Sequence, residues 1–137
     1  MYVEDISALT QSHSDSAMRQ LADIREGLEH LHGSVTLLEI SITGLHASEP
    51  VPFDDVYEVG FYGHGVLYDI GYVMAKAIVE NDGPQGLAAL LKRPSYGLIQ
   101  RYTQLSNYGK DKDHPRLGVN TVAAVHELES SCKQGYL

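Results

Sequence analysis

Two histidine–glutamate pairs occur at spacings that metal chemistry uses. Glu26 and His30 are four residues apart, so on a helix both side chains would project from one face and could hold one edge of a metal ion. The alternative is an exposed helical ion pair, and His32, two residues further on, would point elsewhere. Because two ligands are too few for a metal site, we predict no metal and no cofactor.

The segment 126–130 is the nearest approach to a zinc-binding helix. Such a helix carries two histidines four residues apart, with a glutamate beside the first histidine as general base. His126 and Glu127 fit this pattern, but Ser130 stands where the second histidine belongs. Cys132, the single cysteine, has no evident base partner. We therefore predict no catalytic residue.

Tyrosines and glycines gather in the middle of the chain. The sequence has 9 tyrosines, 2 phenylalanines and no tryptophan, and the tyrosines at 57, 62, 68 and 72 surround the glycine-rich segment 60–65. A tyrosine buries its ring and keeps a hydroxyl for a partner, which suits either a binding groove or the edge of a core. His64 could contribute to the groove or cap the helix that follows. The candidate ligand-binding residues are Tyr62, His64, Tyr68 and Tyr72.

Composition limits the class of protein. A chain of 137 residues fits a single domain, 1–137, with one core. Its formal net charge of -8, with no basic stripe, opposes binding to nucleic acid. No apolar run approaches the roughly 20 residues that cross a bilayer, and the N-terminus lacks the pattern of a signal peptide. Together with the single cysteine, these features predict a soluble, cytoplasmic protein.

Residues 15–47 are expected to form a long helix against which the other helices pack. Apolar residues recur there at spacings of three and four from Leu21 to Leu45, which predicts one long helix with a buried seam. A break near Gly33 is the alternative. Leu37 and Ile40 lie outside the seam, so we expect them to form an interface.

Shorter helices are expected to follow a connection at 49–65. In that connection, 57–61 could form a short extended segment. Helices are predicted at 66–81, ending in a turn at Gly83, then at 84–92, at 95–105 after a Ser95 cap, and from an Asn120 cap through 128. The prediction is an all-α bundle of about five helices around one long central helix.

The middle of the chain also resembles a known family. The segment 68–78 (Tyr-Asp-Ile-Gly-Tyr-Val-Met-Ala-Lys-Ala-Ile), followed by Gly83, the leucines of 87–91, Pro94 and Tyr102, is similar to the C-terminal helical part of zinc-dependent peptidases of the gluzincin type. The resemblance covers about 40 residues and implies fold more than chemistry. It implies that His64 could steady an oxyanion in a complete site. The zinc-binding half of such a peptidase is missing from this sequence.

Two hypotheses of function follow. The first is a non-catalytic interaction or assembly module, a homo-oligomer or the binder of another protein, acting through an exposed apolar surface. The second is a ligand-binding domain or hydrolase whose pocket, between the long helix and 60–72, is completed by a partner chain that carries the zinc-binding helix.

Overall fold

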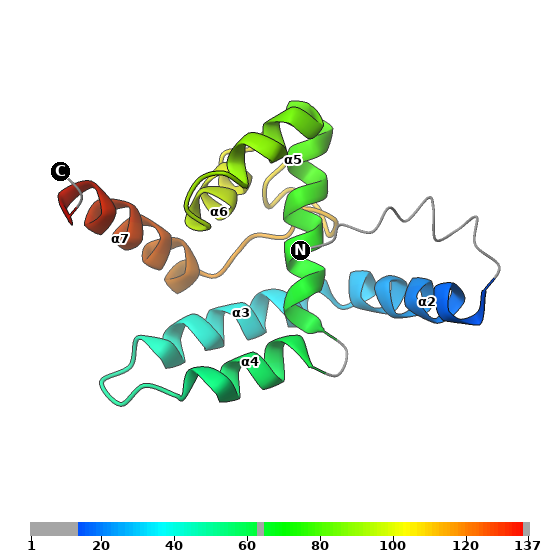
Figure 1. Ribbon diagram of the computed structural model, residues 1–137, viewed down its shortest axis with the longest axis horizontal. Coiled ribbons are helices and arrows are strands. Elements are labelled where there is room, and N and C mark those ends of the chain that lie inside the picture. The colour runs from blue at the N-terminus through cyan, green and yellow to red at the C-terminus, as the bar shows by residue number, and fades with distance from the viewer. Residues whose placement is uncertain (1–13, 63–64, 136–137) are drawn as a thin grey trace.

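The protein is all-α in the computed structural model, which describes residues 14–62 and 65–135. These ranges contain no strand and six helices: α2 (Asp15–Glu29), α3 (Leu31–Leu45), α4 (Phe53–Phe61), α5 (Val66–Leu90), α6 (Tyr96–Thr103) and α7 (Val119–Gly135). They form a helical bundle, as predicted (Figure 1). None of the helices described combines the length and apolar character that a bilayer crossing requires.

The predicted single helix over 15–47 is wrong, because the chain breaks between α2 and α3. The break falls at His30, whose backbone (φ -113°, ψ 24°) leaves the helical region and whose N–H turns back to the carbonyl of Gly27. The alternative, a break near Gly33, agrees better with the structure: the break lies three residues before Gly33, which is itself inside α3. The break changes the helix direction (Figure 1), and both halves still pack on α5, with Leu21 and Leu31 buried.

Helix α4 lies in the segment 49–65, which was expected to be a connection. The residues 57–61, expected to be extended, are helical. Pro52 precedes the first turn, and Asp54 and Asp55 lie in that turn, where the helix dipole favours carboxylates. Gly60 is buried against Leu67 of α5, and a Cβ at this position would collide with the leucine side chain. Helix α4 therefore packs closely against both α3 and α5.

Helix α5 is the central element of the bundle and packs against α2, α3, α4 and α6. It consists of two helical segments joined at Gly83, whose positive φ (74°) breaks the helical path just before Pro84. The turn predicted at Gly83 is thus confirmed. Beside it, the guanidinium of Arg101 on α6 donates two hydrogen bonds of 2.6 Å to the Asp82 carboxylate. This Arg101 contact lowers the pKa of Asp82 to about 2.

The core lies between α3, α5, α6 and the loop that leads to α7. It consists of Val35, Ile70, Met74, Ala77, Ile78, Tyr102, Leu105 and Leu117. Tyr102 is completely buried, and its hydroxyl donates to the carbonyl of Pro115 at 2.9 Å. The ring of Tyr108 packs edge-on against Tyr102, and the Tyr108 hydroxyl accepts from the Leu117 N–H. These contacts fix the loop to the core.

A carboxylate from α3 caps the first turn of α7. Glu39 accepts hydrogen bonds of 2.7–2.8 Å from the backbone N–H and the side chain of both Asn120 and Thr121. Asn120 was predicted to cap this helix, but it lies within α7 and donates to Glu39. Gly118 leaves the space that Glu39 fills, because a Cβ there would collide with the carboxylate. Ser95 precedes α6 as predicted but makes no side-chain cap.

Asp69 lies where α5 crosses α2, with its carboxyl group against Gly27. Burial raises the pKa of Asp69 to about 6. A carboxyl group whose pKa is higher in the folded chain than in the unfolded chain destabilises the fold when the pH is above the folded pKa. This destabilisation disappears when the pH falls below the unfolded pKa. We therefore expect Asp69→Asn to raise the melting temperature at about pH 7.5, and this gain to shrink as the pH falls to about 4. Thermal unfolding of both proteins across this range tests the prediction; an equal gain at every pH contradicts it.

Candidate docking surface

Aromatic side chains form an exposed ridge along α4. Ring contacts join Phe53 to Tyr57, Tyr57 to both Phe61 and Tyr62, and Phe61 to Tyr68 at the start of α5, with centroids 4.9–6.1 Å apart. We call these five residues the aromatic ridge. Phe53 is 64% exposed and Tyr62 67% exposed, and only Phe61 is half-buried. A cluster of large apolar rings that the fold leaves uncovered is typical of an interaction site.

The spacing of residues on α4 explains the ridge. Phe53, Tyr57 and Phe61 recur every four residues and therefore follow one side of the helix. Gly60 lies buried on the side that packs inward. Asp54 and Glu58 each follow a ridge residue by one position, so they border the ridge, whereas Asp55 lies further around the helix. The exposed part of α4 thus combines aromatic rings with carboxylates.

The charge of the chain is distributed very unevenly. No lysine or arginine occurs between Arg25 and Lys76, a segment that includes α3, α4 and the first turns of α5. Eight of the 18 acidic residues lie there, at 26, 29, 39, 49, 54, 55, 58 and 69. Acidic and basic residues balance in the rest of the chain, so this segment accounts for the whole net charge of -8. The aromatic ridge therefore lies in a region of negative potential.

The structure brings together only some of the predicted site residues. Tyr62 and Tyr68 belong to the aromatic ridge, but Tyr72 lies in a separate cavity on α5. His64 lies outside the described residues. Of the two predicted interface residues, Ile40 is 61% exposed on α3 and Leu37 is half-buried. The prediction missed Phe53 and Phe61, although their four-residue spacing around Tyr57 was a readable signal.

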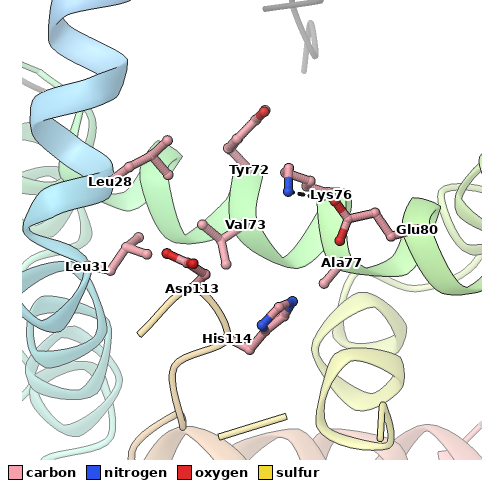
Figure 2. A pocket seen from close by; sticks show the side chains of 9 residues that line it. All are labelled: Leu28, Leu31, Tyr72, Val73, Lys76, Ala77, Glu80, Asp113 and His114. Atoms are coloured by element: carbon pink, nitrogen blue, oxygen red, sulfur yellow. Dashed lines mark hydrogen bonds and ion pairs between the residues drawn. The ribbon is translucent and has the colours of Figure 1, made fainter. Parts of the chain in front are cut away.

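A cavity of about 360 Å³ opens between the α2–α3 break, α5 and the loop before α7. Figure 2 shows Leu28 and Leu31 on one side, Tyr72 and Lys76 on α5, and His114 on the loop. Lys76 binds Glu80 at 2.6 Å, and the His114 ring lies 2.8 Å from the Asp111 carboxylate. The charged groups that line the cavity are therefore partly engaged with neighbours, and Leu28, Leu31, Val73 and Ala77 contribute its apolar lining.

The residues described provide no group of three or more histidine, cysteine, aspartate or glutamate side chains that could hold a metal ion. Glu26 and His30 form no ion pair, because α2 ends before His30 and the two residues do not share one continuous helix. The expected ion pair is thus wrong. His126 is exposed on α7, and the Ser130 hydroxyl there donates to the carbonyl of His126.

Comparisons with family models, with curated proteins and with solved structures find no match for this chain. The resemblance to gluzincin-type peptidases stays a prediction.

Proposed function

We propose that this chain is a non-catalytic protein-interaction module that binds a partner through the aromatic ridge. The exposed aromatic cluster on α4 is the observation that supports the proposal, because a fold rarely leaves so many adjoining rings uncovered without a partner. Tyrosine and phenylalanine are also enriched at interfaces.

The scaffold supports presentation of the ridge. Buried Gly60 and half-buried Phe61 anchor α4 to the first turns of α5, and Gly44 on α3 lies against Val51 just before α4. Rigid elements that hold exposed rings in place lower the entropy cost of binding. A structural relationship to the helical half of a metallopeptidase is compatible with such a scaffold and is part of the same proposal.

The test of this role is nuclear magnetic resonance of the uniformly labelled protein, with light scattering on the same samples. Binding through the aromatic ridge should shift its amide and ring signals in one of two conditions: when an amphipathic helical peptide is added, if the partner is another protein, or when the protein is concentrated, if the partner is a second copy. Phe53→Ser together with Tyr57→Ser should abolish these shifts, while Val119→Ser, which alters an exposed residue on α7, should preserve them. Ridge signals that respond to neither condition would contradict the proposal, as would stoichiometric zinc in protein purified without added metal.

A small-molecule binding role is a second candidate, favoured by the cavity of about 360 Å³ beside Tyr72. Its size is within the range of ligand pockets, and its walls combine apolar residues with Lys76 and His114. In the same spectra, small-molecule fragments that shift the signals of Val73 and Ala77 and leave the ridge unchanged would favour this candidate.

A further inference from the structure

We propose that the partner of the aromatic ridge is an amphipathic helix whose apolar face is bordered by lysine and arginine. The inference rests on the proposed interaction role and adds the chemistry of the partner. It follows from three observations: the carboxylates beside the ridge, the absence of lysine and arginine from the segment 26–75, and the geometry of α4.

The carboxylates of Asp54 and Glu58 are available to a partner. Both residues are exposed, and neither makes an ion pair or a side-chain hydrogen bond with any other described residue. The nearest lysines and arginines in the sequence lie outside the segment 26–75, so α3 and α4 contain neither residue. A partner that places lysine or arginine beside the apolar contact would supply the missing charge.

The exposed rings favour the same partner. Tyr57, Tyr62 and Tyr68 are each at least 40% exposed, so part of each ring remains accessible. A guanidinium or ammonium group over the face of a tyrosine is attracted by the ring, and arginine forms this contact most often. Each basic group can therefore interact with a ring and a carboxylate together.

A second copy of this chain is a poorer occupant. In a two-fold symmetric pair the same surface meets itself, so two α4 helices packed antiparallel through their rings would bring Asp54 and Glu58 close to the same carboxylates of the other copy. Like charges placed together across an interface oppose association. The segment 26–75 contains no lysine or arginine to relieve this repulsion.

The geometry of the ridge indicates a helix as the binding element. Phe53, Tyr57 and Phe61 run parallel to the α4 axis, and α4 packs only against α3 and α5 among the described helices. It lies at the edge of the bundle in Figure 1. An added helix can interdigitate its own four-residue ridges with this one, as packed helices do throughout globular proteins.

The experiment is a titration of the whole chain with designed helical peptides of about 18 residues, observed by nuclear magnetic resonance and calorimetry. One set has leucines along one face bordered by lysine and arginine, and its members differ in leucine spacing. A second set has glutamate in place of every cation, and a third has the basic composition in scrambled order. We expect only the first set to bind with high affinity, with shifts centred on the aromatic ridge.

Variants of α4 then test the location. Asp54→Lys together with Glu58→Lys should weaken binding of the basic peptide by about tenfold or more at about 0.1 M salt, and should allow the acidic peptide to bind. Asp55→Lys is the matched control for Asp54→Lys alone: each reverses one charge in the first turn of α4, but Asp55 lies further around the helix. Asp55→Lys should reduce the affinity much less. Lysine at position 54 or 55 removes a carboxylate that the α4 dipole favours, so the two changes should weaken the first turn to a similar degree, and circular dichroism checks that each variant keeps its helices.

The results separate this inference from the proposed function. Equal binding of the basic and acidic sets at the ridge, or preference for the neutral peptide, would overturn the inference and leave the interaction role intact. Self-association through the ridge without peptide binding would also overturn the inference and leave the interaction role intact, because it would identify a second copy as the partner. If the scrambled basic peptide binds as tightly as the basic amphipathic set, charge alone causes the attraction, and this result would also overturn the inference.

Discussion

Replacement of Tyr102 by alanine is expected to destabilise the fold by about 3–5 kcal/mol, the usual cost of removing a large buried aromatic side chain. Tyr102 is completely buried in the core, and its hydroxyl donates to Pro115. Alanine would leave a cavity, remove the edge-on contact with Tyr108 and take away the partner of a loop carbonyl. Equilibrium unfolding in urea measures this loss.

Tyr102→Phe separates the hydrogen bond from the ring. This variant keeps the packing and should cost only about 1 kcal/mol, the net value of one hydrogen bond. We also expect faster amide exchange at Arg116 and Leu117, because the loop before α7 loses one of its ties to the core. An alanine variant no less stable than the phenylalanine variant would contradict the central place of Tyr102 in the core.

Glu39→Ala is expected to destabilise the protein by about 2–3 kcal/mol, because it removes the cap of α7 and a charge beside the positive end of the helix dipole. Four donors from Asn120 and Thr121 would lose their acceptor. The loss of local stability should be largest in the first turn of α7, so amide exchange at Asn120 and Thr121 should become faster. Urea unfolding and amide exchange measure the two effects.

The ionisation of Glu39 provides a control. Desolvation acts to raise the pKa of Glu39, but hydrogen bonds from Asn120 and Thr121 outweigh it and the pKa is lowered. A carboxylate with a lowered pKa stabilises the fold above its unfolded pKa, and this contribution is lost as the pH falls through the folded value. The difference between the wild-type protein and Glu39→Gln should therefore be largest near neutral pH and vanish in acid. A constant difference would show that charge plays no part in the cap.

The helical class could be predicted from the sequence because its apolar periodicity is strong. The spacing from Leu21 to Leu45 indicated helix correctly, but nothing in the local residues marks His30 as the break. Glu29 and Leu31, on either side of His30, are compatible with a continuous helix, so local helix propensity does not explain the break. Gly83 was correctly predicted because a glycine followed by a proline is a strong local signal.

Helix α4 was missed because its local residues are typical of a loop. Pro50, Pro52 and the glycines at 60, 63 and 65 resemble a loop, yet Pro52 precedes a helix and Gly60 allows that helix to approach Leu67. The cap of α7 could not be read from the sequence, because Glu39 lies 81 residues before Asn120. Of the four tyrosines expected to gather, three lie in the ridge, which two phenylalanines complete, and Tyr72 lies in the separate cavity.

The concentration of all net charge in the segment 26–75 also bears on the kinetics of encounter. Three of the eight acidic residues of this segment lie on α4, beside the ridge, so the negative charge is unevenly placed along the chain. A basic partner diffusing nearby would be turned toward the ridge before any ring is touched. The rate of association should therefore fall steeply as ionic strength rises, while the lifetime of the complex, set by ring packing, should change little.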